Sequence, residues 1–295
     1  MYVCVYASQV AMCIGMNRYK KVSDAVMLMW QRISPVSFKD AMRRNNRLTE
    51  DDMINALVEA RGDVRALVDK SMATTAATST EAASCYHGAS NELQQCSLDP
   101  EEKVLVDSVL RKNVYTTYGT RAEPEMLQYI RDVLCIPCHT DPTFYKIRMG
   151  EVDGVPWFVG GKIDALSDDS QLLIEIKNRV NRLFFRAPAY EAVQVQTYLE
   201  LLDIGHGALV ECLKGEHGVQ TNVIPIARDK AFWRHEVVPK LSRFVSFLIR
   251  LLNDAALQDA FLTSRRPSAM VTQYLPNEFY GKTGDAEPSC GTRNW

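Results

Sequence analysis

The stretch that decides the fold runs Gly160-Gly161-Lys162-Ile163-Asp164-Ala165-Leu166 and, after a short polar turn, Leu172-Leu173-Ile174-Glu175-Ile176-Lys177. A short aliphatic run bounded by turn residues predicts a strand over 172–177. Side chains at positions i and i+2 of a strand share a face, so Glu175 and Lys177 project together while the aliphatic residues between them point into the core. Asp164 is expected to end a neighbouring strand. A hairpin across the polar turn 167–171 would then bring Asp164 beside Glu175.

These three side chains suggest a specific chemistry. Two carboxylates at one point repel each other unless a cation lies between them. Oxygen ligands with no His or Cys nearby favour Mg²⁺ or Mn²⁺ over zinc. A lysine on the same face can orient a water or stabilise negative charge on a phosphate. The pattern therefore fits hydrolysis of a phosphodiester assisted by one or two metal ions, although a surface hairpin with an ordinary Glu/Lys pair would also produce it.

Two flanking segments favour the catalytic interpretation. Downstream, Gln194 and Tyr198 lie four residues apart in a predicted helix and so share a face. Upstream, Glu123 and Pro124 open another predicted helix, from which a third carboxylate could reach the metal site. Favourable placement of Glu123 against the helix dipole would explain the same residue without a catalytic role.

The rest of the chain predicts an α/β fold, with a mixed central β-sheet flanked by helices and a helical N-terminal insertion. Helices are expected over 8–16, 24–32, 37–72, 100–112, 123–134, 188–202 and 231–252, and strands over 145–149, 156–163, 172–177, 208–213 and 219–226. Small residues dominate 73–98, which predicts a mobile loop. We expect a single domain over 1–263, with a helical region 1–114 and a catalytic core 115–263, followed by a loosely attached tail over 264–295.

Composition bounds the function. The chain has 295 residues, of which 46% are hydrophobic and 24% charged, as in globular proteins and unlike disordered or collagen-like chains. No apolar run is long enough to span a membrane, and the first residues lack the basic lead of a signal peptide, so an intracellular location is expected, in the cytoplasm or in the nucleus of a host cell if the protein is viral. The net charge of -2 gives no global nucleic-acid signature, so any DNA contact must come from local patches.

One such patch follows the predicted strand. It holds four basic residues and no acid, with two aromatic residues between them, in the order Lys177, Arg179, Arg182, Phe184, Phe185 and Arg186. Basic side chains near a cleft could neutralise phosphates, and an aromatic ring could stack at a strand end. A solvated basic loop over a buried pair of phenylalanines explains the patch equally well.

Taken in order, a helix with Glu123, a strand with Asp164, a strand with Glu175-x-Lys177 and a helix with Gln194-x-x-x-Tyr198 resemble the PD-(D/E)XK nuclease superfamily. Within it, the chain resembles the lambda-exonuclease-like (YqaJ-type) viral recombinase nucleases. Ala7-Ser8-Gln9-Val10-Ala11 followed by Ile14-Gly15-Met16-Asn17-Arg18-Tyr19-Lys20 is similar to that group's N-terminal helix and loop. The resemblance covers residues 6–32 and 115–213.

The resemblance implies a restriction-endonuclease-like core and assigns roles. Asp164, Glu175, Glu123 and the backbone carbonyl of Ile176 would bind one or two Mg²⁺ or Mn²⁺ ions, Lys177 would be the catalytic lysine, and Gln194 would help to hold the site. The residues it places at the DNA, together with the basic patch, are Ser8, Arg18, Lys20, Arg179, Arg182, Arg186, Gln196 and Tyr198.

The implied activity is that of a Mg²⁺-dependent 5′-to-3′ exonuclease on the ends of linear double-stranded DNA, used in recombination, repair or viral replication. Family members form ring trimers and work with a single-strand annealing protein, and the resemblance implies both as candidate partners. Two other functions stay open at this stage. One is a resolvase-like, structure-specific endonuclease on the same fold, and the other is a catalytically degenerate DNA-binding protein. The intact set of two acids and a lysine argues against the second.

Overall fold

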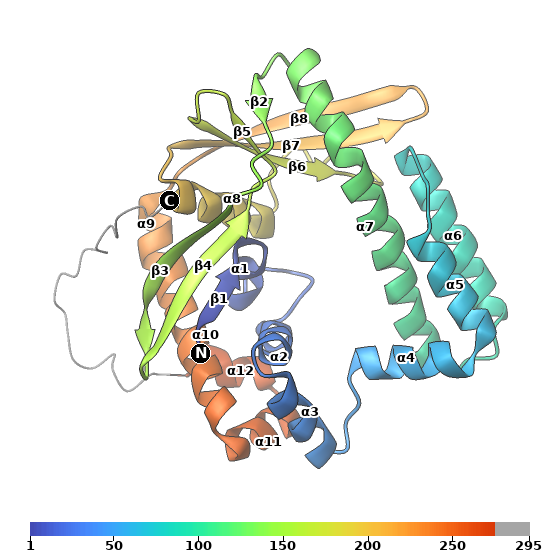
Figure 1. Ribbon diagram of the computed structural model, residues 1–295, viewed down its shortest axis with the longest axis vertical. Coiled ribbons are helices and arrows are strands. Elements are labelled where there is room, and N and C mark those ends of the chain that lie inside the picture. The colour runs from blue at the N-terminus through green and yellow to red at the C-terminus, as the bar shows by residue number, and fades with distance from the viewer. Residues whose placement is uncertain (275–295) are drawn as a thin grey trace.

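The computed structural model describes residues 1–274, which form two mixed sheets flanked by helices (Figure 1). The first sheet has the strand order β1 (Val3–Tyr6), β4 (Val155–Lys162), β3 (Phe144–Val152), and the second has the order β2 (Cys138–His139), β5 (Ala165–Ser167), β6 (Leu172–Asn178), β7 (His206–Gly215), β8 (Gly218–Ala227). The predicted fold class is confirmed, with one refinement. The expected central sheet is divided in two, because the chain leaves β4 after Lys162 and joins the second sheet from Ala165 onward.

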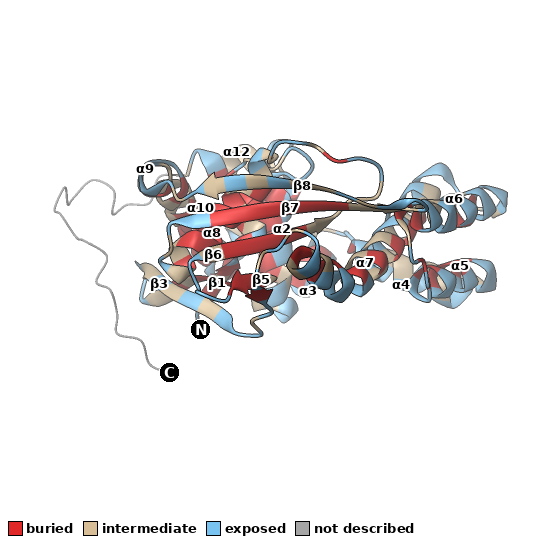
Figure 2. Cartoon of the chain, turned by 90° about the horizontal axis from the view of Figure 1, so that it is seen from above, coloured by how far each residue is buried: buried red, intermediate tan, exposed pale blue. Residues whose placement is uncertain are grey.

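Strand β6 is buried on both faces. Ile174 and Ile176 pack in one hydrophobic cluster with α7 (Pro100–Asp132), and Leu173 packs in another with α8 (Ala189–Leu202). Figure 2 shows β6 and β7 as buried strands between these layers. The pairing of β6 with β7 is parallel and needs a crossover, which α8 provides. The face that carries Glu175 is therefore covered by protein as well.

Helix α7 replaces two helices predicted over 100–112 and 123–134. It is continuous over 33 residues and contains Pro124 in its interior. Proline lacks the N–H that would bond to the carbonyl four residues earlier, which normally ends a helix. Here the buried face continues on both sides of the proline, through Tyr118 and Ala122 before it and Met126 and Ile130 after it, so packing on the sheet offsets the missing bond. Glu123 consequently lies in mid-helix and not near an N-terminus.

The mobile loop predicted over 73–98 is wrong, because most of it forms α6 (Ser79–Gln95). Its N-terminus is capped by Thr78, whose hydroxyl accepts a hydrogen bond from the Glu81 N–H at 3.2 Å. The small residues that suggested a loop allow close packing instead, since Ala82 and Ala89 are buried. Together with α4 (Glu50–Ala60), α5 (Gly62–Met72) and the first half of α7, α6 forms a helical arm beside the sheets (Figures 1 and 2).

The two ends of the described chain pack together. Strand β1, which the sequence did not predict, leads into α1 (Ala7–Cys13), α2 (Val22–Ile33) and α3 (Pro35–Arg44), and these pack with α10 (Val238–Asn253), α11 (Ala255–Thr263) and α12 (Pro267–Thr272). A three-residue helix, α9 (Lys230–Phe232), and a π-helical turn (Trp233–Val237) precede α10.

Helix α12 corrects the predicted tail. Val271 is buried, and the Ser268 hydroxyl donates a hydrogen bond to that of Ser23 at 3.0 Å, so the chain is packed beyond the predicted boundary at 264. The remainder of the predicted tail, 275–295, lies outside the described residues. Among residues 1–274, no helix is both long enough and apolar enough to cross a membrane.

Gly160 provides a test of how closely β3 and β4 pack. A Cβ atom there would lie 2.8 Å from Phe144 Cε1 and 2.8 Å from the Tyr145 carbonyl oxygen. Because the backbone oxygen cannot move aside, we predict that Gly160→Ala lowers the free energy of unfolding by about 1–3 kcal/mol, measured by urea denaturation. Gly88→Ala on α6 is the matched control, since a Cβ there meets nothing within 4 Å, and it should not destabilise the protein. Equal stability of the Gly160 variant and the native chain would contradict the packing.

Candidate active site

The β5–β6 hairpin places Asp164 beside Glu175. Ala165 pairs with Ile174 in antiparallel register, so the next pair outward along the hairpin is Asp164 and Glu175. Asp164 Oδ2 accepts a hydrogen bond of 2.7 Å from the backbone N–H of Ile176. This bond fixes the Asp164 carboxylate against the edge of β6. The two acids that lie eleven positions apart in the sequence are therefore neighbours across one turn.

The backbone of Ile176 faces the same edge. In a strand, the N–H and C=O groups of one residue point to the same side. Because the Ile176 N–H points to Asp164, its carbonyl also lies on the Asp164 side of β6 and not on the side of β7. The carbonyl that the sequence resemblance assigns as a metal ligand is therefore directed toward the carboxylates.

Glu175, Lys177 and Gln194 form a closed triangle of hydrogen bonds. Lys177 Nζ donates to Glu175 Oε1 at 2.7 Å and to Gln194 Oε1 at 3.3 Å. Gln194 Nε2 donates to the same Glu175 oxygen at 2.8 Å. Strand β6 supplies the first two residues on one face, and α8, which covers that face, supplies the third. The structure thus brings together four of the five residues predicted to be catalytic.

Burial perturbs the charges of this cluster. Glu175 is 2% exposed, and burial raises its pKa to about 7, against the lowering effect of Lys177 and with a further increase from Asp164. Burial also raises the pKa of Asp164, opposed by the Ile176 hydrogen bond and Lys177. Burial works against the Lys177 ammonium, but Glu175 and then Asp164 outweigh it, so the pKa of Lys177 lies above its usual value. Both carboxylates would ionise more readily beside an additional positive charge.

One oxygen of Glu175 has no partner that would stabilise its charge. Its Oε2 atom is buried and has no hydrogen-bond partner, whereas Oε1 accepts two. A buried carboxylate oxygen without a partner is costly unless a cation or proton meets it. Asp164, Glu175 Oε2 and the Ile176 carbonyl are hard oxygen donors, which suit Mg²⁺ or Mn²⁺. The residues present therefore fit a divalent cation at this edge of β6.

Glu123 borders the cluster without joining it. Asn178 Nδ2 donates to the Gly119 carbonyl at 3.0 Å and so attaches the end of β6 to α7 one turn before Glu123. Burial raises the pKa of Glu123, and the negative charge of Asp164 raises it further, so the two carboxylates lie close enough to interact. However, the described residues contain no group of three or more His, Cys, Asp and Glu side chains arranged to hold a metal ion. The structure thus places two acids together and the third on the neighbouring helix.

Two residues predicted at the DNA lie in the interior instead. Gln196 is 7% exposed, with Nε2 donating to the Ala227 carbonyl at 2.6 Å and Oε1 accepting from the Asp229 N–H at 2.9 Å. It therefore fixes the chain after β8, and both ends of its amide group are used within the protein. Tyr198 is buried beneath Gly161, where an added Cβ would lie 2.8 Å from the tyrosine ring. Both residues follow Gln194 on α8, but they point into the core.

Arg179 is also not a surface residue. Its guanidinium donates to both oxygens of Glu191, at 2.7 and 2.6 Å, and through Nε to Glu211 at 2.8 Å. All three side chains are nearly buried. Glu211 additionally accepts hydrogen bonds from the backbone N–H groups of Phe184 and Phe185. A DNA contact by Arg179 is contradicted, because this network uses its donors to hold the loop that follows β6.

The loop that follows β6 carries the other residues of the basic patch. Arg182 and Arg186 are exposed, as predicted for contacts with phosphates. The two phenylalanines have different surroundings: Phe184 lies under the Arg179 guanidinium, 4.2 Å from ring centre to Cζ, whereas Phe185 is 71% exposed with φ of 60°. A bulky residue seldom adopts this left-handed conformation. The sequence pattern could not distinguish the two rings, since the difference comes from the Arg179 guanidinium, which Glu191 and Glu211 hold over the Phe184 ring.

The N-terminal residues approach from the other sheet. Ser8 is exposed on the first turn of α1, directly after β1. The neighbouring Ala7 packs in the same cluster as Tyr198, which places this turn on the side of α8 that carries the site. Arg18 and Lys20 are exposed on the loop after α1, and Lys20 lies toward α7.

Of the comparisons with known proteins, the one with solved structures finds matches. No protein-family model and no curated protein sequence matches the chain. Among solved structures, the chain is similar to an alkaline exonuclease (LHK-Exo) from Laribacter hongkongensis, with 18% identity over 65% of this chain and 91% of that one and a TM-score of 0.37. The same exonuclease in complex with dAMP gives 19% identity, coverages of 67% and 92%, and a TM-score of 0.37. At this TM-score the backbones overlap only in part, so the candidate site rests on its own contacts.

Metal binding can be tested without activity. We predict that Mg²⁺ or Mn²⁺ raises the Tm of the protein, because an ion that binds only the folded chain at a hundredfold excess over its Kd contributes about 2.7 kcal/mol. Asp164→Asn, which keeps an acceptor for the Ile176 N–H, should lose most of this shift in differential scanning fluorimetry. Glu125→Gln is the control, because Glu125 pairs with Lys214 outside the cluster. An undiminished shift in the Asp164 variant would place the ion elsewhere.

Proposed function

We propose that the protein is a metal-dependent deoxyribonuclease of the PD-(D/E)XK superfamily, acting as a 5′-to-3′ exonuclease on linear double-stranded DNA. The observation that carries the proposal is the pairing of the half-buried Asp164 with the buried Glu175, which has one unpartnered oxygen and Lys177 beside it. A purely structural ion pair would satisfy both oxygens of a buried carboxylate. A buried unsatisfied oxygen beside a lysine and a second carboxylate instead supports a site that binds a cation or carries out chemistry.

The residues of the chain then have distinct tasks. Asp164, Glu175 and the Ile176 carbonyl would hold Mg²⁺ or Mn²⁺. When bound, the ion would lower the pKa of the attacking water and neutralise charge on the phosphate. Lys177 would orient the water and stabilise charge that develops on the phosphate oxygens. Gln194 holds Lys177 and Glu175 in place through two hydrogen bonds, and Glu123 would approach from α7.

The loop after β6 would bind the DNA. Arg182 and Arg186 are free to neutralise phosphates, and the exposed Phe185 ring is available to stack on a terminal base. The buried Arg179–Glu191–Glu211 network holds this loop a few residues from Lys177, so a base stacked on Phe185 would lie close to the site. Ser8 would approach the terminal phosphate from α1. The polarity, a role in recombination, repair or viral replication, a ring trimer and a single-strand annealing partner follow from the family resemblance.

Digestion of end-labelled duplex DNA tests this function. With Mg²⁺, a linear duplex should be shortened progressively, with label released from the 5′ end first, whereas a covalently closed circle should survive. Lys177→Met should lower the rate at least a hundredfold, because general catalysis by a positioned side chain contributes about 10²–10⁴-fold. Excess chelator should stop the reaction. Cleavage of the circle would indicate an endonuclease instead, and full activity in chelator would refute the metal mechanism.

Two glutamates on α7 separate a catalytic role from a structural one. The Glu123 carboxylate is repelled by that of Asp164, whereas Glu125 pairs with Lys214 at 2.7 Å. We expect Glu123→Gln to reduce kcat by at least tenfold and Glu125→Gln to leave it within twofold, with both variants folded by circular dichroism. If the two variants lose activity equally, the carboxylate of Glu123 has no special part in the reaction.

A further inference from the structure

A stripe of exposed residues runs along α7 from the candidate site into the helical arm. Lys112, Thr116, Thr120 and Glu123 are all exposed. Eleven residues make three helical turns to within 20°, so Lys112 and Glu123 lie on the same face, about 16 Å apart along the helix axis. The two residues between them carry short side chains. The surface of α7 between the site and Lys112 is therefore unobstructed by its own side chains.

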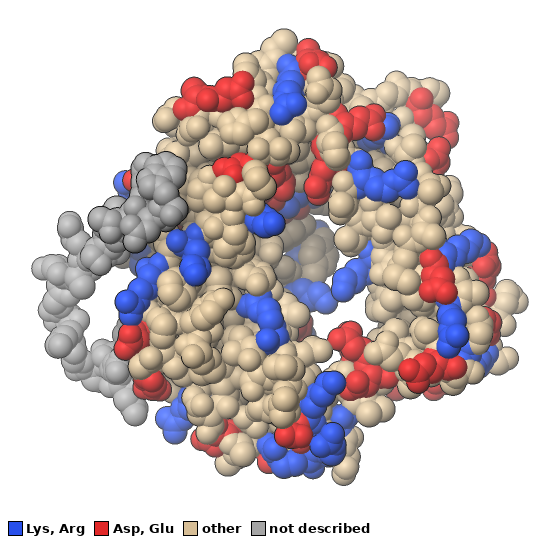
Figure 3. Space-filling model, viewed as in Figure 1, with Lys and Arg blue, Asp and Glu red and all other residues tan. Residues whose placement is uncertain are grey.

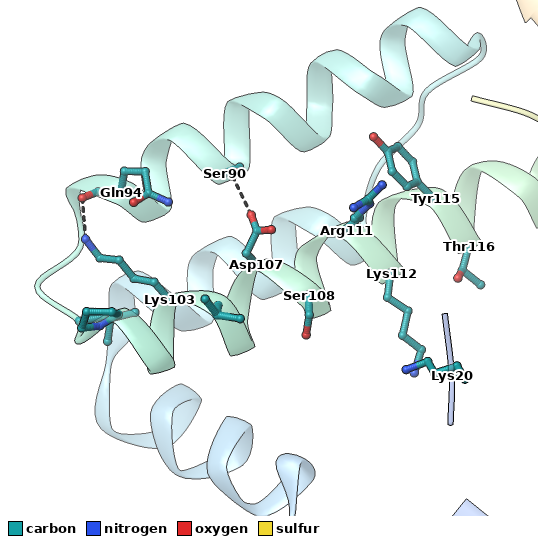
Figure 4. Close-up of a pocket in the computed structure, with 13 residues that line it drawn as sticks. Lys20, Ser90, Gln94, Lys103, Asp107, Ser108, Arg111, Lys112, Tyr115 and Thr116 are labelled. Atoms are coloured by element: carbon teal, nitrogen blue, oxygen red, sulfur yellow. Dashed lines mark hydrogen bonds between the residues drawn. The ribbon is translucent and has the colours of Figure 1, made fainter. Parts of the chain in front are cut away.

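The far end of this stripe borders a pocket of about 1110 Å³. It lies between α6, α7 and the loop that follows α1, which contributes Lys20. Figure 4 shows Lys20 and Lys112 extending toward one another from these two segments. In the space-filling view, an opening separates the helical arm from the rest of the molecule, and Lys and Arg side chains lie beside it (Figure 3).

The charge of the pocket is positive. Its lining includes Lys20, Lys103, Arg111 and Lys112 and one acid, Asp107. The Asp107 oxygens accept hydrogen bonds from Tyr86 and Ser90, at 2.8 and 2.7 Å, which hold α6 to α7. Among the described residues, neither Lys20 nor Lys112 has an acidic partner within ion-pairing distance. Two ammonium groups that converge without an anion repel each other, so their approach favours a negatively charged ligand between them.

Local structure holds Lys20 in this position. Asn17 Oδ1 accepts hydrogen bonds from the backbone N–H groups of Tyr19 and Lys20, at 2.9 and 3.1 Å. The Tyr19 ring packs edge-on against Tyr190 at the start of α8, with 5.7 Å between ring centres. The loop is thus shaped by an Asx turn and fixed to the layer that carries Gln194.

We propose that this pocket binds the phosphodiester backbone of a nucleic-acid strand whose other end lies at the candidate active site. The inference rests on the proposed nuclease function and extends it, because no motif of the resemblance covers the helical arm. A polymer fits better than a compact anion. Lys112 and Glu123 share a face of α7 about 16 Å apart, a span that about five nucleotides at 3.4 Å each cover and a compact anion does not.

The residues that line the pocket favour contacts with phosphates over contacts with bases. Its aromatic residue, Tyr115, faces the Arg111 guanidinium, which lies 6.0 Å from the Tyr115 ring centre and 5.9 Å from that of Tyr86. Arg111 therefore lies over one face of each ring, which leaves cations as the main contacts that the pocket offers a ligand. Contact through cations alone is independent of sequence and sensitive to salt.

Binding measured in chelator tests the pocket apart from catalysis. Fluorescence anisotropy with a labelled 20-base-pair duplex should show that Lys20→Ala/Lys112→Ala weakens affinity at least tenfold at 0.1 M salt. The slope of log K against log salt should fall by about two units, since each lost phosphate contact removes about 0.9. Lys39→Ala on α3, outside the pocket, is the matched control and should change neither value. An unchanged affinity and slope in the double variant would overturn the proposal.

Competition between a small polyphosphate and the duplex tests whether the pocket binds a compact ligand instead. Inorganic tripolyphosphate, at concentrations that leave ionic strength constant, should displace the duplex from the native chain no better than from the double variant. Selective displacement from the native chain would show that the pocket holds a small polyphosphate and would overturn a backbone site. Failure of the proposed function is distinguishable, because it would appear as absence of Mg²⁺-dependent cleavage by the native chain, whatever the binding measurements give.

Discussion

The structure depends on one constraint, which is the close approach of two carboxylates with little access to water at the open end of the β5–β6 hairpin. Glu175 is buried under α8 and Asp164 is half-buried beside it, and burial raises the pKa of both. Lys177 and Gln194 satisfy one oxygen of Glu175, and the Ile176 N–H satisfies one oxygen of Asp164. The remaining demand for positive charge is the basis of the proposal that a divalent cation binds at this edge of the sheet.

The strand that bears these residues also anchors a second polar network, which has a different purpose. Two residues after Lys177, Arg179 is paired with Glu191 and Glu211 and is almost fully buried. This network satisfies its own charges and, through Glu211, holds the backbone of Phe184 and Phe185. The contrast is informative, because the network that supports the loop is fully hydrogen-bonded and the cluster assigned to chemistry is not. The part of the loop that we propose to face DNA begins only at Arg182.

The sequence predicted the features that depend on local pattern. Alternation within 172–177 placed Glu175 and Lys177 on one face, the polar turn predicted the hairpin, and spacing on α8 placed Gln194 correctly. It failed where distant contacts decide. The small residues of α6 resemble a loop until α7 is present to pack against them, and Pro124 ends a helix unless both flanking turns are buried. Arg179, Gln196 and Tyr198 lie at spacings compatible with the surface, and only Glu211, Ala227 and Gly161 from other strands show that they are interior.

The most direct test of the account is a crystal structure of the protein soaked in Mn²⁺, examined by anomalous scattering at the manganese edge. The account predicts an anomalous peak at the edge of β6, with oxygens of Asp164 and Glu175 and the Ile176 carbonyl at about 2.0–2.3 Å, the range for a hard divalent ion with oxygen ligands. A crystal with manganese bound elsewhere, or with no manganese bound, would contradict it.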